Sequence, residues 1–164
     1  MGKQVQPGEM NAVTDYSALI DGAGINVCKL LLDDELTILW ANDNFYISSG
    51  FGKDEYQTLF HHIKAYYTGH GDEFAKIKNA FYDVLQKGER RVKVGCRRPL
   101  KDNTCAWINI DGIITGEIVD SKPVALAVYS DISDLTRLKA ERDQLLEEKT
   151  RYFEWMMDEY VGNI

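Results

Sequence analysis

The clearest pattern in the chain is an apolar segment that leads directly into a long charged one. Residues 124–129 read Val-Ala-Leu-Ala-Val-Tyr and predict a buried strand, because short apolar runs with β-branched and aromatic residues favour sheets. After the polar segment 130–134, helix-forming residues continue to Tyr160 without glycine or proline. A core strand joined to a long solvated helix suits the transmission of a structural change better than it suits catalysis.

The N-terminal part of the pattern predicts a hairpin and a short helix. Residues 25–32 and 36–40 read as two strands around the acidic turn 33–35. Asn42 is suited to cap the helix that follows, because its side chain can accept a hydrogen bond from the first helical turn, and Gly50 closes that helix.

Two further helices are predicted before the remaining strands. Asp54 and Glu55 fit the first turn of one helix, where the macrodipole favours acidic residues. The other covers 72–86, with Asp72 as its N-cap and Gly88 as its stop. Its apolar residues recur at helical spacing: Phe74, Ile77, Phe81, Val84 and Leu85.

Three strand-like segments, 90–98, 104–115 and 123–129, complete the pattern. Strands grouped at both ends of a helical region predict an α+β fold, with one antiparallel sheet and the helices on one face. The last strand is apolar on both sides, whereas a sheet with one wet face should alternate apolar with polar residues. We therefore expect a cover for the second face, either the short helix near Tyr16–Ile20 or a second copy of the chain.

Composition excludes several functional classes. The 164 residues carry a net charge of −7, which argues against nucleic acid as a partner, because phosphate binding needs clustered lysine and arginine. The basic residues of 90–98 alternate with apolar ones, and we interpret them as the outer face of a strand. No apolar run approaches the roughly 20 residues that span a bilayer, and no signal peptide opens the chain, so we expect a cytoplasmic protein without membrane insertion.

Candidate chemistry is sparse. The cysteines number three and form no Cys-x-x-Cys pair, so buried reduced thiols explain them better than a zinc site does. His61, His62 and His70 have no acidic or cysteine partner at metal-ligand spacing. No nucleophile–base pair and no glycine-rich phosphate loop is present, so we expect no metal site, no catalytic residues and no enzymatic activity in these residues.

An ordered set of segments resembles a known family. The chain contains Ile38-Leu-Trp-Ala-Asn42-Asp-Asn-Phe45 and Gly50-Phe51, the helix 72–86, Trp107-Ile-Asn-Ile110 and Asp131-Ile132-Ser133. Together these resemble the PAS sensor domains of bacterial signalling proteins over about residues 24–134. The resemblance implies a five-stranded antiparallel sheet with helices folded over it and a pocket between them. It also implies that Asp131, Ile132 and Ser133 relay a change to a C-terminal signalling helix, with serine in place of the commoner threonine.

This resemblance divides the chain into three parts. Residues 1–23 are expected to form an N-terminal tail and short helix, 24–134 the PAS domain, and 135–164 an output helix or linker. Because the helix has no stop signal before residue 164, we expect a further module to follow it. Such a module would be a histidine kinase of a two-component system or a cyclic-dinucleotide enzyme.

The resemblance also suggests a ligand site between the sheet and the helices of 42–86. The candidate pocket walls are Phe45, Tyr56, Ile77, Phe81, Trp107 and Asn109. The alternative is that these side chains only fill the core. The cofactor stays unknown, but a flavin adduct is not expected because 58–67, the matching region, has no cysteine. Haem is not expected either, because 73–86 has no histidine.

Two functions therefore remain open. The first is a sensory module that binds a small molecule or partner and regulates a downstream effector domain through its C-terminal helix. The alternative is a ligand-free PAS dimerisation scaffold. Both involve a homodimer, because residues 135, 138, 142, 145, 149, 152 and 156 form a coiled-coil seam, although Arg142 and Lys149 make it imperfect.

Overall fold

The computed structural model describes residues 19–20 and 22–162 of the chain. The N-terminal tail and Tyr16, which belong to the expected first part of the chain, lie outside the described residues. The described chain separates into two units, of which the first ends at Asp131 and the second begins at Ile132.

The first unit is built on a five-stranded antiparallel sheet, as the pattern predicted. Its strands are β1 (Asn26–Leu31), β2 (Thr37–Ala41), β3 (Arg91–Pro99), β4 (Cys105–Val119) and β5 (Lys122–Asp131), in the order β2-β1-β5-β4-β3. The strand β5 lies at the centre, where Tyr129 pairs with Asn26 on one side and with Ile110 on the other.

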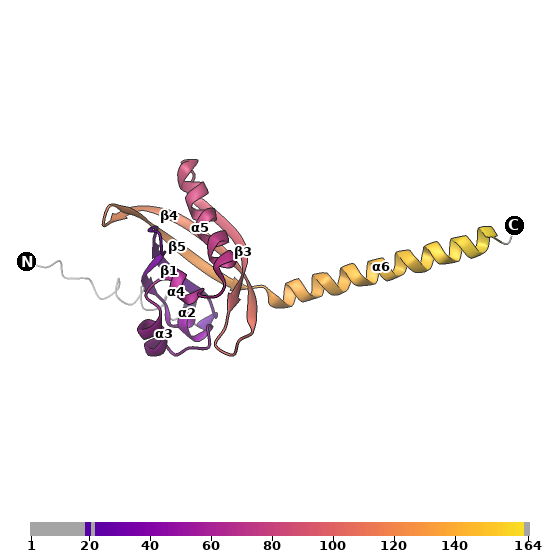
Figure 1. Cartoon of the computed structure of the whole chain (residues 1–164), viewed down its shortest axis with the longest axis horizontal. Coiled ribbons are helices and arrows are strands. Elements are labelled where there is room, and N and C mark those ends of the chain that lie inside the picture. Colours follow the sequence, from indigo (N-terminus) through magenta and orange to yellow (C-terminus); the bar gives the residue numbers. More distant parts are fainter. Residues whose placement is uncertain (1–18, 21, 163–164) are drawn as a thin grey trace, which may run out of the picture. The chain divides into compact units, whose positions relative to one another are not determined.

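The helices of this unit cover one face of the sheet (Figure 1), which confirms the predicted fold class. They are α2 (Asp43–Ile47), α3 (Lys53–Leu59), α4 (Ile63–Tyr66) and α5 (Gly71–Gln86). Alternate strand residues point toward them, because side chains on a strand alternate between its two faces. Cys28, Cys96, Ile108, Ile110 and Tyr129 join one hydrophobic core with Phe45, Tyr56, Ile77 and Phe81 of the helices.

Two helix starts test the predicted caps. Asn42 caps α2, because its Oδ1 accepts a hydrogen bond from the Phe45 N–H at 3.2 Å. The prediction for α5 was wrong by two residues: the helix begins at Gly71 with His70 at the N-cap, and Asp72 lies in the first turn. An acid there still complements the positive end of the helix dipole.

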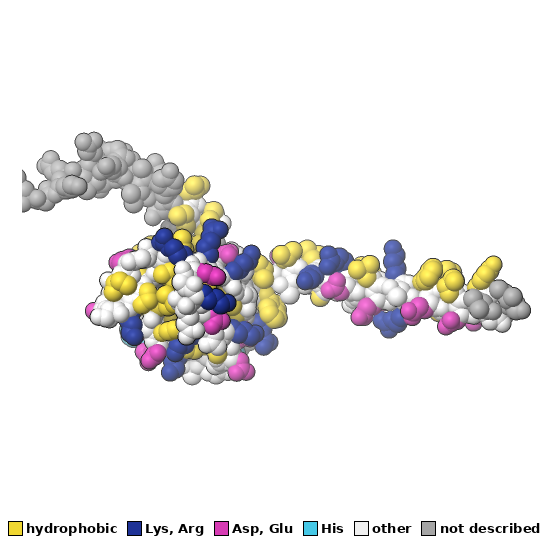
Figure 2. All heavy atoms as spheres, turned by 90° about the horizontal axis from the view of Figure 1, so that it is seen from above, with side chains coloured by type: hydrophobic (Ala, Val, Ile, Leu, Met, Phe, Trp, Pro, Cys, Tyr) yellow, Lys and Arg dark blue, Asp and Glu magenta, His cyan; other side chains and the backbone are white. Residues whose placement is uncertain are grey.

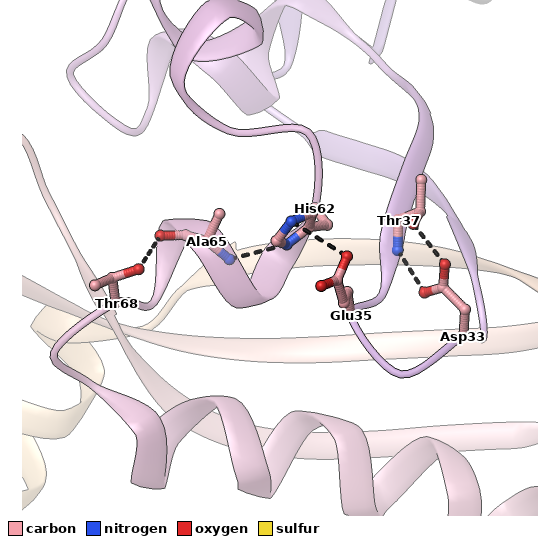
Figure 3. Close-up of polar contacts among 6 residues, drawn as sticks. All are labelled: Asp33, Glu35, Thr37, His62, Ala65 and Thr68. Atoms are coloured by element: carbon pink, nitrogen blue, oxygen red, sulfur yellow. Dashed lines mark hydrogen bonds and ion pairs between the residues drawn. The ribbon is translucent and has the colours of Figure 1, made fainter.

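The helix α4 was not predicted as a separate element. Its N-cap is His62, whose Nδ1 accepts a hydrogen bond from the Ala65 N–H at 3.1 Å (Figure 3). The other ring nitrogen of His62 lies 3.3 Å from a carboxylate oxygen of Glu35, in the loop before β2. Histidine is not among the preferred capping residues, which hid this helix start in the sequence.

The β1–β2 hairpin is fixed by one carboxylate. Asp33 accepts hydrogen bonds from the Thr37 N–H at 3.0 Å and from the Thr37 hydroxyl at 2.6 Å (Figure 3). Burial alone would raise the pKa of Asp33, but these hydrogen bonds hold it below its usual value. The ionised side chain therefore ties the start of β2 to the end of β1.

Among the described residues, burial on the second face of the sheet differs between its two ends. The strand β4 continues past the expected residue 115 to Val119, with a register shift between Ile114 and Ile118. Glu117 in this extension lies 2.7 Å from the Lys29 ammonium on β1. Val124 is fully buried there, whereas Leu126 further along the same face of β5 is 38% exposed.

The second unit is the helix α6 (Ser133–Gly162). Its hydrophobic side chains stand at intervals among lysine, arginine and acidic residues (Figure 2). The exposed apolar set consists of Leu135, Leu138, Leu145, Leu146, Tyr152, Phe153, Trp155, Met156, Met157 and Tyr160. Within the described chain, no helix has the length and apolar character needed to cross a membrane.

Candidate functional site

The centre of the helix-covered core is a cluster of aromatic rings. Phe45 of α2 lies edge-on to Tyr56 of α3 at 5.7 Å and to Tyr129 of β5 at 5.3 Å, measured between ring centroids. Tyr56 also stacks on Tyr66 of α4 at 5.2 Å. Three successive helices and the distant strand β5 therefore contribute to one cluster, and all four rings are buried.

A buried arginine lies among these rings. Arg98 of β3 is 3% exposed, and its Cζ lies 4.8 Å from the ring centroid of Phe45 and 5.5 Å from those of Tyr66 and Tyr129. Its Nη2 donates to the Phe45 carbonyl at 2.9 Å, and its Nη1 donates to the Ser48 hydroxyl at 2.7 Å. The guanidinium thus lies at the C-terminal end of α2, where the helix dipole favours a cation.

The position of Arg98 corrects the interpretation of the basic residues of 90–98 as one outer face. Arg91, Lys93 and Arg97 are exposed, but Arg98 faces the core with Cys96. The reason is the two-residue period of a strand, which sends adjacent side chains to opposite faces. Arg97 and Arg98 therefore cannot share a face, and this parity was the signal that could have located Arg98.

Arg98 has no carboxylate partner in the part of the chain that the structure describes. None of the ion pairs formed within 4.0 Å there includes it. Its hydrogen bonds go to one hydroxyl and one carbonyl, and the Tyr66 hydroxyl is a third polar neighbour, so its five N–H donors are only partly used. A buried charge is costly unless it is paired and hydrogen-bonded, so this guanidinium is only partly compensated.

Three tyrosine hydroxyls in the same core also lack partners. The hydroxyls of Tyr56, Tyr67 and Tyr129 are buried and make no hydrogen bond within the described residues. Burial raises the pKa of all three groups, and the positive charge of Arg98 acts against that rise in each case. The hydroxyls are therefore neutral donors, and they gather around one cation.

Two cysteine thiols lie beside these hydroxyls, Cys28 next to Tyr129 and Cys96 next to Tyr67. A thiol is a weak hydrogen-bonding partner, and neither hydroxyl bonds to it with normal geometry. Burial raises the pKa of Cys28 to about 12 and that of Cys96 to about 11. Both thiols stay protonated at neutral pH and are poor nucleophiles, because the thiolate is the reactive form.

A groove of about 550 Å³ reaches the cluster from the side of β2. Tyr56 forms part of its wall together with Tyr46 and Phe60, and Trp40 and Lys53 stand at more exposed positions along it. Tyr56 therefore contacts both this groove and Tyr66, whose ring centroid lies 5.5 Å from the Arg98 guanidinium carbon.

The structure brings together four of the six predicted pocket walls. Phe45, Tyr56, Ile77 and Phe81 are buried in the core between the sheet and the helices. Trp107 and Asn109 of β4 lie on the opposite face, because Ala106, Ile108 and Ile110 are the residues of that strand that point toward the helices. Trp107 is 42% exposed, and the Arg97 guanidinium carbon lies 5.6 Å from its ring centroid.

The expected relay residues occupy the boundary between the two units. Asp131 ends β5, Ile132 follows it, and Ser133 begins α6. The Ile132 carbonyl accepts a hydrogen bond from the Thr136 N–H at 2.9 Å, the first of the helical series. The strand therefore passes into the helix across a single residue.

Solved structures resemble this architecture. A sensory box histidine kinase/response regulator from Burkholderia thailandensis E264 matches with a TM-score of 0.63 and 17% identity, over 83% of this chain and 98% of that one. The PAS domain of an HTR-like protein from Haloarcula marismortui matches with a TM-score of 0.53 and 15% identity, over 75% and 93%. The chain has the PAS fold.

A longer protein shares the PAS fold as well. An RNA-binding light-oxygen-voltage receptor matches with a TM-score of 0.64 and 12% identity, over 93% of this chain and 41% of that receptor. This chain therefore spans well under half of the receptor. No family model and no curated protein matches the sequence.

Proposed function

We propose that this chain is a sensory PAS module that binds a small molecule between its helices and its sheet. The observation that carries the proposal is the group of incompletely satisfied polar side chains inside the aromatic core, Arg98 with Tyr56, Tyr67 and Tyr129. A core whose only task is folding is better served by apolar side chains of the same shape, because each unsatisfied buried donor costs free energy. A bound molecule that accepts these hydrogen bonds removes that cost.

The output side of the proposal is the junction at Asp131, Ile132 and Ser133. Tyr129 belongs both to the polar group and to β5, and β5 enters α6 after one intervening residue. A ligand that changes the hydrogen bonding of Tyr129 thus acts on the strand that leads into α6. We expect the effector to be a separate module of the same polypeptide, and this chain to act on it without catalysis of its own.

The test is hydrogen–deuterium exchange on the purified full chain, with and without a compound that raises its melting temperature in a metabolite screen. The expected result is protection of the core amides together with a changed exchange rate at 131–136. Binding that protects the core but leaves 131–136 unchanged would contradict the relay. Failure of every compound in a broad screen to raise the melting temperature would contradict the sensory function.

A ligand-free dimerisation scaffold is the second candidate, and the exposed apolar residues of α6 favour it. Leu138, Leu145 and Tyr152 are 55%, 64% and 63% exposed, and they occupy the predicted seam positions. A parallel homodimer would bury them against their copies. A sensory module can form this dimer as well. Observing the dimer therefore favours the scaffold over the sensor only if no ligand is found.

The dimer is tested by sedimentation equilibrium of the full chain at micromolar concentrations. Leu145→Glu should shift the chain toward monomer, because it places a charge in the seam. Gln144→Glu, a change of the neighbouring residue outside the seam, is the matched control and should leave association unchanged. A wild-type chain that stays monomeric throughout would rule out the α6 dimer.

A further inference from the structure

The polar group around Arg98 has a composition that restricts what can bind there. It consists of hydrogen-bond donors: the remaining N–H groups of one guanidinium and the hydroxyls of Tyr56, Tyr67 and Tyr129. Arg98 is the only lysine or arginine among the buried residues of the described chain. The missing component is therefore an acceptor that carries one negative charge.

We propose that the ligand of this core is a small organic carboxylate, held by the Arg98 guanidinium and by the hydroxyls of Tyr56, Tyr67 and Tyr129. This inference rests on the proposed sensory function and names the chemical class that the site selects. A carboxylate only accepts hydrogen bonds and matches the planar fork of a guanidinium. Its single charge equals that of Arg98, whereas a phosphate dianion would leave one charge buried without a partner.

Neutral ligands fit the same group less well. An apolar molecule would leave the three hydroxyls as unsatisfied as they are in the free protein. A primary amide offers one acceptor oxygen and also brings N–H donors to a site that already has a surplus of donors. The aromatic walls formed by Phe45, Tyr66 and Tyr129 leave the remainder of the ligand an apolar surface.

The route of entry is the groove beside β2. Tyr56 contributes to the wall of that groove, and its ring stacks on Tyr66, which also contacts the Arg98 guanidinium. Rotation of the Tyr56 side chain toward the groove opens a path from solvent to Arg98. The same movement places the Tyr56 hydroxyl at the mouth of the site, where it can donate to a carboxylate that has entered.

The first test is isothermal titration calorimetry of the full wild-type chain with acetate, propionate, pyruvate and benzoate, against acetamide, propionamide, pyruvamide and benzamide as uncharged controls. At least one carboxylate should bind, and its amide analogue should bind roughly tenfold more weakly or not at all, because a charge-assisted hydrogen bond is lost. Equal binding of acid and amide, tighter binding of inorganic phosphate, or no binding of any of the four carboxylates at millimolar concentration would overturn the proposal.

The second test uses variants whose expected effects have opposite signs. Tyr129→Phe and Tyr67→Phe should each weaken carboxylate binding by roughly tenfold, yet raise the melting temperature of the ligand-free protein, because an unsatisfied buried hydroxyl is removed. Tyr82→Phe is the control: its hydroxyl donates to the Leu32 carbonyl at 3.2 Å, so the change should lower the melting temperature slightly and leave affinity unchanged. A lower melting temperature with unchanged affinity in Tyr129→Phe would assign its hydroxyl to folding and overturn its role in binding.

Arg98 itself is tested with a conservative variant as well as a disruptive one. Arg98→Lys keeps the charge but loses the fork and should weaken binding, and Arg98→Gln should abolish it. Should Arg98→Gln not fold, the two tyrosine variants still decide the proposal. A neutral compound that binds this core and alters exchange at 131–136 would overturn the carboxylate assignment while leaving the sensory function intact.

Discussion

The two faces of the sheet depart from the usual distribution of side chains in opposite ways. The helix-covered face buries a guanidinium and three unpartnered hydroxyls. The outer face leaves Trp40, Trp107, Ile113 and Leu126 between 38% and 50% exposed, along with a shallow groove of about 560 Å³ lined partly by Val27 and Ile113. The hydrophobic effect alone would place these groups the other way round.

Under the proposals above, the two faces bind different partners. On the helix-covered face, the buried hydrogen-bond donors lack acceptors, which a small molecule bound among them would supply. Exposed apolar side chains gathered on one face call for a protein surface, because such patches on soluble domains mark interaction sites. Because β4 and β5 contribute residues to both faces, a shift of either strand caused by binding on one face also moves side chains on the other.

The largest difference between the faces is expected from truncating one aromatic residue on each. Phe81 of α5 is fully buried against the helix-covered face, and Trp107 is 42% exposed on the outer face. Phe81→Ala should lower the free energy of unfolding by about 3–5 kcal/mol, because it leaves a cavity in a packed core. Trp107→Ala should cost about 1 kcal/mol or less. Urea denaturation of both variants measures this, and equal losses would show that the outer face is as tightly packed as the inner one.

A smaller effect is expected from adding a methyl group on each face. A Cβ at Gly112 of β4 would lie 2.9 Å from Cε1 of the buried Phe81 ring, closer than real contacts allow. Gly112→Ala should therefore cost about 1–3 kcal/mol of stability through overpacking. At Gly95 of β3 the nearest atom to a new Cβ is the Ile108 carbonyl oxygen at 4.0 Å, so Gly95→Ala should be neutral or stabilise by up to about 1 kcal/mol. Thermal unfolding of the Gly112→Ala and Gly95→Ala variants measures this difference in stability. A stabilised Gly112→Ala variant would mean that Phe81 has room to move.

A pH-dependent difference should appear at Glu73, which joins α5 to β3. Its carboxylate accepts a hydrogen bond from the Arg97 N–H at 2.7 Å and lies 3.2 Å from the Lys76 ammonium. Burial alone would raise the pKa of Glu73, but the hydrogen bonds and nearby cations hold it below its usual value. Its stabilisation is therefore complete above the ordinary glutamate pKa and is lost as the pH falls through the lowered one.

Glu73→Gln should accordingly cost about 1–3 kcal/mol at neutral pH, and the loss should shrink toward zero in acid. The outer-face control is Asp111→Asn, which removes an exposed carboxylate that accepts from Asn109 at 2.8 Å. It should change stability by no more than about 0.5 kcal/mol. Urea midpoints measured from neutral to acidic pH provide the comparison, and a constant loss for Glu73→Gln would show that the charge of Glu73 contributes nothing.

The smallest effect is expected where the helices meet the edge strand β2. His62→Ala removes the Nδ1 acceptor that caps α4 and should cost about 1 kcal/mol. Its neighbour His61 bonds to β2 only through its backbone carbonyl, which accepts from the Ile38 N–H at 3.2 Å, so His61→Ala should be nearly neutral. Melting temperatures of the two variants test this, and equal values would remove the capping role of His62.

The spacing of apolar residues predicted much of this fold, because the backbone hydrogen bonding of a helix or strand fixes which positions share its buried face. The β1–β2 hairpin, the cap at Asn42 and the core helix α5 all follow from it. The strands β4 and β5 are joined by a tight turn at Asp120 and Ser121, which both have the positive φ that such hairpin turns require. The extension of β4 beyond residue 115 was missed because a shift in register separates it from the regular part of the strand.

The candidate site was harder to predict, and the reason is strand parity. In Trp107-Ile-Asn-Ile110 the isoleucines point to the core and therefore send Trp107 and Asn109 outward, against their selection as pocket walls. By the same rule, the adjacent residues Arg97 and Arg98 lie on opposite faces, so that Arg97 is exposed and Arg98 is buried. That the Tyr56, Tyr67 and Tyr129 hydroxyls have no partner depends on side-chain geometry across three elements, which no spacing along the chain encodes.

The strand order has a consequence for how the protein is made. The strand β5 is the last to leave the ribosome, yet it lies between β1 and β4 and joins the two halves of the sheet. Until it emerges, the backbone N–H and C=O groups on the β5-facing edges of β1 and β4 have no strand to pair with. Pairings between such distant segments close slowly and leave unpaired edges prone to association. The sheet can therefore be completed only late in synthesis, when β5 pairs with β1 and β4. The helix α6 is translated after that strand.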